Sequence, residues 1–412
     1  MHSETRKILF PYSIVVLLAY IAFSMPLPIL PEMFLDPTEG ILSQSYSLKQ
    51  KTILLGFVMA SFPLGQFFGS PILGHCSDLY GRKKVILLSL MGTVIGYLVT
   101  AMGVMAHSVA GMFCGLMICG FCEGNVTIAQ SVIADLTTTE KQKEEKAVHF
   151  GWLNVVIALG FIIGPLMGGQ LADRSLVSWF TYATPFWMGA ILTLLCIAVI
   201  YFASQETLKA RGTQEWHFID AVMSGFKKRG LRLYFLGNFF LALGYFSYFR
   251  FLPVFLERMF DFSAAQLGYV MVYNSIAIAL GVICLIPPLS RRIKPVQQLA
   301  IFSIFLAGSF VLCLQPENPY YLLATLPPVG LCLAITITNG SLVISNAASS
   351  DFQGGALGTL TSVQVLAEFF TGVFGGVLAA QTLELPLYIG AFMTVISGLI
   401  FGSVSLMRGN RG

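Results

Sequence analysis

Continuous apolar stretches of about twenty residues recur along almost the whole chain, and they constrain its fold more than any other feature. Residues 85–106 and 386–407 are typical examples. An α-helix needs about 20 apolar residues to cross the hydrocarbon core of a bilayer. Strands of a membrane barrel would instead show segments of about ten residues that alternate apolar and polar positions. The stretches therefore predict a bundle of membrane-spanning helices.

Composition agrees, because 56% of the 412 residues are apolar and only 11% are charged, against about 25% charge in soluble proteins. This deficit excludes a soluble enzyme. The first stretch, 9–30, is too long for a signal peptide and is interpreted as a retained span. We predict an all-α membrane protein with twelve transmembrane helices, at 9–32, 52–75, 85–106, 110–134, 149–172, 184–203, 233–256, 266–289, 296–314, 320–345, 356–380 and 386–407.

The longest polar stretch, 204–232, separates two sets of six spans and is predicted to link an N-terminal half, 1–203, to a C-terminal half, 233–412. Most of the 24 Lys and Arg residues fall in the segments that lie on the same side as the N-terminus and this linker. Because cytoplasmic loops carry the excess of basic residues, both termini and the linker are predicted to be cytoplasmic. The net charge of +4 follows from this asymmetry and does not indicate a nucleic-acid partner.

The loop after the second span combines small and charged residues in a specific order: Gly74, Asp78, Gly81, Arg82 and Lys83. A basic turn that only fixes topology would account for the cations but less well for Asp78. The pattern G-x-x-x-D-x-x-G-R-K resembles the cytoplasmic signature of the major facilitator superfamily. That resemblance implies two pseudo-symmetric six-helix halves around a central cavity. It also implies a cytoplasmic gate formed by the charged ends of spans two to four, with Gly74, Asp78, Gly81, Arg82 and Asp135 as its residues.

The fifth predicted span carries a string of small residues and one proline. Its members are Gly151, Gly160, Gly164, Pro165, Gly168 and Gly169. Glycines four apart lie on one helix face and allow close packing, which explains the spacing but not the whole string. The string resembles the fifth-span motif of superfamily antiporters, which implies exchange of a substrate against an ion.

Two further segments are similar to twelve-span drug:proton antiporters, and to tetracycline/proton antiporters in particular. Pro26, Pro28 and Pro31 resemble the proline pattern of their first span, and the region from Gly120 to 151 resembles their fourth and fifth spans. Ala22 replaces a glycine of the first-span pattern, and a second departure from the family bears on proton coupling. Leu116 stands where the family's fourth span usually carries an arginine thought to assist proton transfer, which keeps uptake or exchange of a nutrient open as an alternative.

Three charged residues lie several residues inside predicted spans, where ionisable groups are costly and therefore functional candidates. Glu123 is about 18 Å from Asp135 along span four, and Glu368 is about 15 Å into span eleven. Arg250 is about 27 Å along span seven, near its outer end. We expect Glu123 or Glu368, or both, to exchange a proton for substrate, and Arg250 is a third candidate for proton coupling or substrate contact. The alternatives are buried polar contacts for the acids and a snorkelling side chain for Arg250.

Polar residues within the spans are candidates to contact a substrate in the cavity, and interhelical hydrogen bonds explain them equally well. They are Asn125, Asn238, Tyr245, Asn339 and Gln364.

The leading function is a secondary active transporter that exports an amphipathic organic molecule in exchange for protons. Import or exchange is the alternative, and a non-transporting sensor or scaffold is less favoured. The sequence carries no nucleotide-binding loop, nucleophile elbow or metal-ligand cluster, so we expect no enzymatic activity, cofactor or metal. We also expect a monomer in the bacterial inner membrane, with the lipid bilayer, small organic substrate and protons as its partners.

Overall fold

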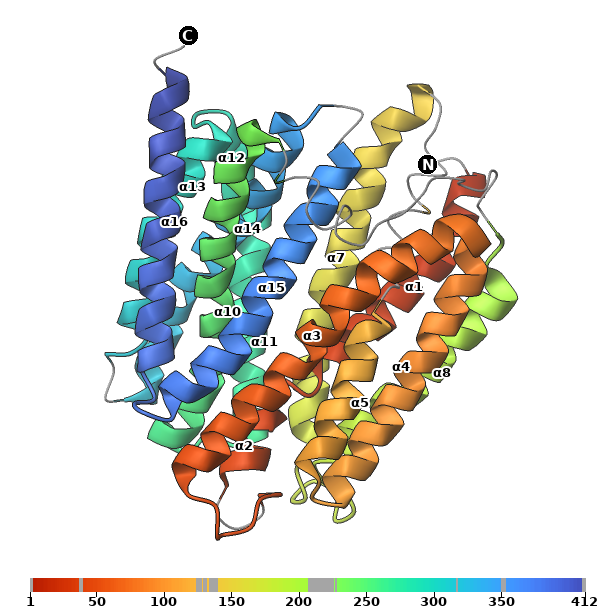
Figure 1. Ribbon diagram of the computed structural model, residues 1–412, viewed down its shortest axis with the longest axis vertical. Coiled ribbons are helices and arrows are strands. Elements are labelled where there is room, and N and C mark those ends of the chain that lie inside the picture. Colours follow the sequence, from red (N-terminus) through yellow and green to blue (C-terminus); the bar gives the residue numbers. More distant parts are fainter. Residues whose placement is uncertain are drawn as a thin grey trace. The chain divides into compact units, whose positions relative to one another are not determined.

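The computed structural model describes residues 3–36, 40–123, 128, 132, 140–206, 226, 228–315, 318–349 and 353–409, and within this part of the chain all regular structure is helical. Figure 1 shows the helices in chain order. They are α1 (Ser3–Ser24), α2 (Ile29–Leu35), α3 (Leu48–Tyr80), α4 (Arg82–Met105), α5 (Val109–Phe121), α7 (Glu140–Leu171), α8 (Thr184–Ala203), η1 (Arg229–Leu231), α10 (Arg232–Phe260), α11 (Ala264–Leu280), η2 (Gly281–Leu285), α12 (Ile286–Ser290), α13 (Pro295–Leu312), η3 (Pro319–Tyr321), α14 (Leu322–Ala347), α15 (Gln353–Ala379) and α16 (Leu385–Gly409).

Ten of the described helical segments are long and apolar enough to cross a membrane, and two shorter apolar helices, Val109–Phe121 and Val155–Leu171, fall in the predicted fourth and fifth spans. The all-helical membrane fold is therefore confirmed. Within the first span, Phe10–Leu35, the helix is interrupted between Ser24 and Ile29. Pro26 and Pro28 lie in this break, where their missing N–H groups cannot continue the helical hydrogen bonds.

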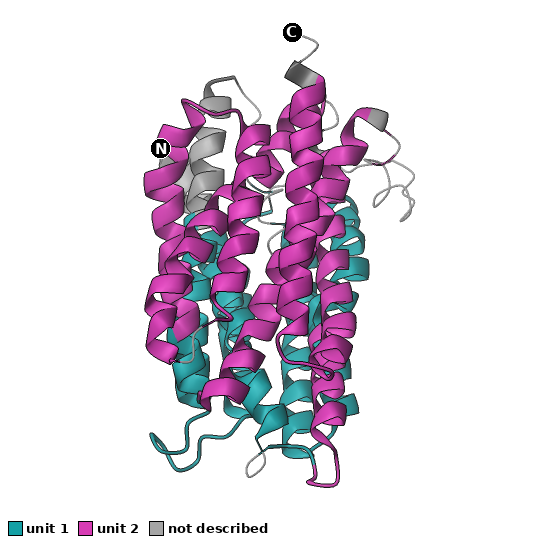
Figure 2. Cartoon of the chain, turned by 90° about the vertical axis from the view of Figure 1, so that its left-hand side faces the viewer, with its two compact units in different colours: residues 1–42, 61–216, 263–269 teal, residues 43–60, 217–262, 270–412 magenta. Residues whose placement is uncertain are grey.

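The contacts divide the chain into two compact units (Figure 2). Unit 1 comprises Met1–Leu42, Ser61–Trp216 and Ser263–Tyr269, and unit 2 comprises Ser43–Ala60, His217–Phe262 and Val270–Gly412. The first part of α3 thus belongs with α10 and α15, and the first turns of α11 belong with α7. The division into halves at 203 and 233 stays a prediction.

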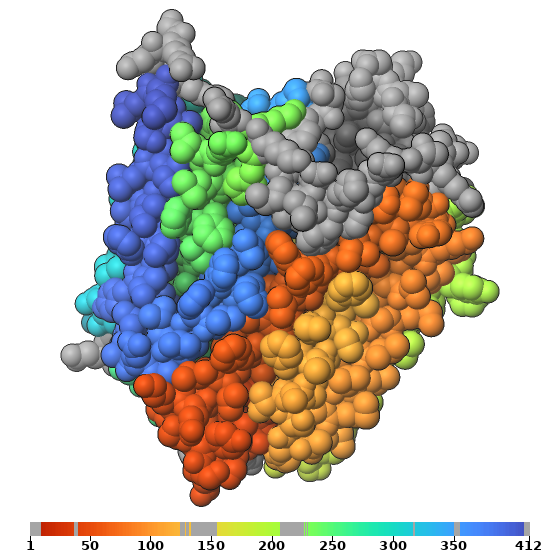
Figure 3. Space-filling model, viewed as in Figure 1, coloured from red at the N-terminus to blue at the C-terminus, as the bar shows by residue number. Residues whose placement is uncertain are grey.

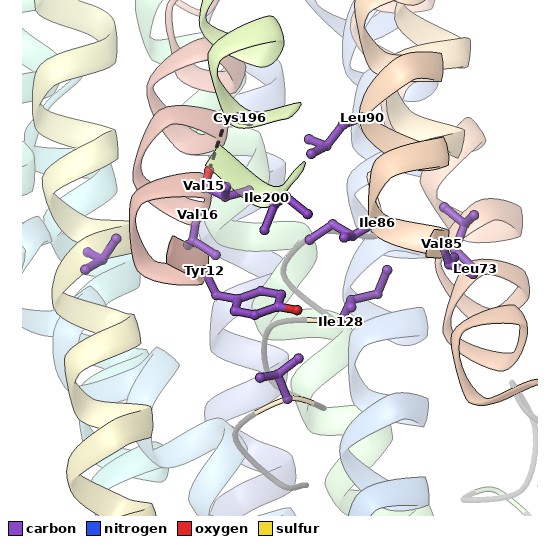
Figure 4. Close-up of a cluster of buried hydrophobic side chains, with 12 residues drawn as sticks. Tyr12, Val15, Val16, Leu73, Val85, Ile86, Leu90, Ile128, Cys196 and Ile200 are labelled. Carbon is purple, nitrogen blue, oxygen red and sulfur yellow. Dashed lines mark hydrogen bonds between the residues drawn. The ribbon is translucent and has the colours of Figure 1, made fainter. Parts of the chain in front are cut away.

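In unit 1, α4 packs against α5 and α8, and α1 packs against α7 and α8. Glycines allow the close approach of α4 and α5, since a methyl group on Gly96 would lie 2.8 Å from the carbonyl oxygen of Gly115. Buried side chains of α1, α3, α4 and α8 form a core that includes Tyr12, Ile86 and Cys196 (Figure 4). Van der Waals packing of such side chains holds helices together where lipid removes the hydrophobic driving force.

In unit 2, α16 packs against both α10 and α13, α14 packs against α13, and α15 packs against α10. The first part of α3 lies against α15, and the space-filling view shows the orange-red α3 in contact with the blue α15 on this face (Figure 3). Arg250 of α10 binds both helices, through Met59 of α3 and Glu368 of α15.

Candidate functional site

Arg250 of α10 and Glu368 of α15 form a buried ion pair. Nη2 of Arg250 lies 2.5 Å from Oε1 of Glu368, and each residue is only 8% exposed. The two residues are 118 positions apart in sequence, and the packing of α10 against α15 brings them together. Of the three charged candidates from the sequence, the structure therefore pairs two. Arg250 does not snorkel outwards, because its guanidinium is bound inside unit 2.

A second bond holds the same guanidinium. Nη1 of Arg250 donates a hydrogen bond to the backbone carbonyl of Met59 in α3, at 2.6 Å. The third guanidinium nitrogen, Nε, is buried without a hydrogen-bond partner. Arg250 thus contacts two helices, with a charged acceptor on α15 and a neutral one on α3. Tyr245, one and a half turns earlier on α10, is buried and interacts electrostatically with the charge of Glu368.

Glu123 lies in unit 1, two residues beyond the end of α5. It is half-buried, and its backbone N–H donates to the carbonyl of Gly120 at 3.0 Å. Its carboxylate interacts electrostatically with Tyr97 and Cys122. Its proposed part in proton exchange stays a prediction.

The polar cavity candidates differ in their surroundings. Asn238 donates to the backbone carbonyls of Tyr234 and Gly340, and Asn339 donates to the side chain of Gln298 at 2.9 Å. Both asparagines are buried and make interhelical bonds, the alternative that the sequence left open. Gln364 is half-buried one turn before Glu368 on α15. Asn125 lies outside the described residues, as does Asp135 of the predicted gate.

The loop between α3 and α4 has a defined charge arrangement. Gly81 has a φ of 106°, a conformation that favours glycine, and this permits the reversal between the two helices. Arg82 is buried and pairs with Asp78 at 2.5 Å, while its Nη1 also donates to Ser77 at 2.6 Å. Gly74 supplies the carbonyl that accepts the hydroxyl of Ser77 at 2.7 Å. The Asp78–Arg82 pair joins residues four positions apart, and its part in a cytoplasmic gate stays a prediction.

Two carboxylates that the sequence analysis did not single out bind helix N-termini. Glu206 accepts hydrogen bonds from the first backbone N–H groups of α4. Glu32 accepts from the backbone N–H of Ala264 at the start of α11, and Tyr182 donates to its other oxygen at 3.2 Å. An acidic residue at or just past the end of a predicted span is the signal that could have indicated both, because helix N-termini attract carboxylates.

The glycine string of α7 lies against two helices within unit 1. A methyl group on Gly160 would lie 2.5 Å from Cβ of Tyr20 in α1, and one on Gly169 would lie 2.5 Å from the carbonyl of Ala264. Gly164 and Gly168 face Ser24 and Met25, and the Pro165 carbonyl faces Gly268 of α11. Gly151 begins the string within α7. Gly160, Gly164, Gly168 and Gly169 therefore allow close packing of α7, and the motif's part in antiport stays a prediction.

A family model described as Major Facilitator Superfamily matches residues 12–324. The chain belongs to the Major Facilitator Superfamily. As a member of this superfamily it is an integral membrane protein. It is 30% identical over 211 residues to the class B tetracycline resistance protein of Escherichia coli, an alignment that covers 51% of this chain and 46% of that protein. The chain thus spans about half the length of that relative.

Solved structures of the superfamily share its fold. The human organic anion transporter MFSD10 superposes with a TM-score of 0.69 at 20% identity, over 96% of this chain and 99% of that one. The nucleoside transporter NupG superposes with a TM-score of 0.73 at 17% identity, over 96% of this chain and 98% of that one. At such identities these likenesses confirm the major facilitator fold predicted from the sequence, and nothing finer.

Proposed function

We propose that this protein is a secondary active transporter that exports an amphipathic organic small molecule in exchange for protons, by alternating access. The buried Arg250–Glu368 ion pair carries the proposal. Taking two charges out of water costs free energy that burying well-packed apolar residues would not, so a purely structural role is a weak reason to keep the pair at this depth. The similarity to a tetracycline resistance protein supports export.

The proposed coupling follows from the chemistry of the pair. Protonation of Glu368 removes its negative charge and with it the Coulombic attraction to Arg250. The α10–α15 bond is then weakened, which favours an access state in which that bond is broken. Release of the proton restores the pair. Glu123 in unit 1 is proposed as a second proton acceptor, because it lies in the predicted fourth span.

A specific feature of Arg250 favours an organic anion as a second candidate substrate class. Nε and Nη2 form the edge of a guanidinium that a carboxylate can bridge with two parallel hydrogen bonds. Glu368 binds this edge through Nη2, and Nε is without a partner. A substrate anion that bridged both nitrogens would displace a protonated Glu368. The structural likeness to a transporter described as carrying organic anions fits this candidate.

Reconstituted proteoliposomes with an imposed pH gradient test both candidates. Cationic, anionic and zwitterionic amphipathic compounds are added in turn, and internal pH is recorded with a trapped dye. Proton movement on addition of a compound supports coupled transport, and its direction separates antiport from symport. Arg250→Lys keeps the positive charge but lacks the paired N–H donors of a guanidinium. Loss of the proton movement driven by anionic compounds in this variant would favour the anionic class. Unchanged coupling in both Glu123→Gln and Glu368→Gln would contradict the proposal.

A further inference from the structure

The Met59 carbonyl that binds Arg250 is available because of a proline. In a regular α-helix, the carbonyl of residue 59 accepts the backbone N–H of residue 63. Position 63 is proline, which has no N–H and whose ring displaces the carbonyl four residues earlier. The hydrogen bond that α3 cannot make at this position is replaced by the guanidinium of Arg250 at 2.6 Å.

Helix packing brings Arg250 within reach of both acceptors. The faces of α3 and α15 that meet carry small residues four positions apart: Gly56 and Ala60 on α3, and Gly372 and Gly376 on α15. A methyl group on Gly56 would lie 2.6 Å from the Gly372 carbonyl, so the backbones are in direct contact. Glu368 lies one turn before Gly372 on α15. The ion pair therefore sits at the end of this close contact.

We infer that Pro63 is a positioning residue that anchors Arg250 to α3 through the Met59 carbonyl, so that protonation of Glu368 releases α15 while α3 stays bound to α10. The inference rests on the proposed proton exchange at Glu368. A carbonyl does not titrate in the physiological range, and a guanidinium stays charged. Of the two bonds that Arg250 makes, the one to Glu368 responds to a proton and the one to Met59 does not. Tyr245 is the other titratable residue described beside Glu368.

The chain offers a matched control for the backbone chemistry. Pro327 in α14 likewise leaves the carbonyl of Leu323 without its helical donor, and the hydroxyl of Tyr273 in α11 donates to it at 2.8 Å. This site has the same proline-freed carbonyl and a side-chain donor from another helix. It differs in that the donor is neutral and makes no ion pair with Glu368.

A double-mutant cycle between Pro63→Ala and Arg250→Gln tests the anchor, with unfolding midpoints measured on purified full-length protein in lipid nanodiscs. Alanine restores the N–H at residue 63, so the Met59 carbonyl regains a helical partner. Arg250→Gln should then lower the midpoint less in the Pro63→Ala background than in the wild-type background, by on the order of 2 °C or more. If Arg250→Gln alone does not fold, the cycle is run with Glu368→Gln present throughout, which removes the unpaired carboxylate.

The control cycle combines Pro327→Ala with Arg250→Gln and should be additive. Additive effects in the Pro63 cycle as well would overturn the anchor. Transport in the same variants separates this inference from the proposed function. If proton coupling is absent from the wild-type protein but the Pro63 cycle is non-additive, the anchor stands and the exchange role of Glu368 fails. If coupling is present and Pro63→Ala lowers turnover at least twofold, with the Pro327→Ala rate unchanged, both stand.

Discussion

The carboxylate of Glu206 accepts the backbone N–H of Arg82 at 2.9 Å, at the first residue of α4. Its second oxygen accepts the N–H of Lys83 at 3.2 Å. In return, the ammonium group of Lys83 donates to the carbonyls of Tyr201 and Ser204 at the end of α8, at 2.9 and 2.7 Å. The N-terminus of one helix and the C-terminus of its neighbour are therefore each bound by a side chain of complementary charge.

Glu206→Ala is expected to destabilise unit 1 by about 1 kcal/mol, the usual cost of losing a helix cap. Glu206→Gln keeps one acceptor oxygen and should cost less. Unfolding midpoints of the two variants in nanodiscs check this order. Equal midpoints for wild type and both variants would show that the cap contributes nothing to stability.

Arg250→Gln is expected to destabilise the protein by about 3 kcal/mol or more, because it leaves the carboxylate of Glu368 buried without its cation. Arg250→Gln combined with Glu368→Gln should recover much of that loss, since no unpaired charge remains. Guanidinium or thermal unfolding of the two single variants and the double variant measures the recovery. A double variant less stable than Arg250→Gln would show that buried charge is not the cause.

Local patterns were sufficient to predict the helical membrane fold and the charged turn at Gly81. Each span needs a sufficient length of apolar residues, and this can be seen in its own sequence. The Asp78–Arg82 pair is also local, because the two residues lie four positions apart. The pairing of Arg250 with Glu368 depends on how two helices pack, and nothing in the residues around either one specifies the other. Their positions in apolar runs indicated only that each is a functional candidate, and the fold brought the two together.

The consequences of prolines in the helices could likewise be predicted only in part from the sequence. The sequence shows that Pro63 frees a carbonyl in α3, but not that Arg250 of α10 satisfies it. It shows three prolines in the first span, but not that Glu32, in the helix after the interruption, accepts the backbone N–H of Ala264 at the start of α11. Backbone consequences of proline are local and predictable, whereas the groups that compensate for them come from tertiary packing.

Glu32 provides a test of a cap supplied from another helix. Glu32→Ala removes the acceptor for both the Ala264 N–H and the Tyr182 hydroxyl. Its unfolding midpoint should fall by more than that of Tyr182→Phe, which removes one hydrogen bond worth about 1 kcal/mol. Because both substitutions act on the same carboxylate, Tyr182→Phe should have a smaller effect when combined with Glu32→Ala than alone. Additive midpoints would indicate that the two residues stabilise the protein independently.

The contact between α3 and α15 predicts that glycine size is critical at its centre. Gly372→Ala places a methyl group 2.8 Å from Cβ of Ala60, so the helices must move apart, at a cost of about 1 to 3 kcal/mol. Gly358→Ala, on the same helix, meets nothing within 4 Å and should be neutral or stabilising, since alanine favours helix over glycine. Unfolding midpoints of the two variants give the comparison. With Arg250 anchored to α3, separation of α3 from α15 should also lengthen its bond to Glu368, so Gly372→Ala should reduce proton-coupled transport while Gly358→Ala retains it. Equal transport in the two variants would contradict a role for the close contact in holding the ion pair.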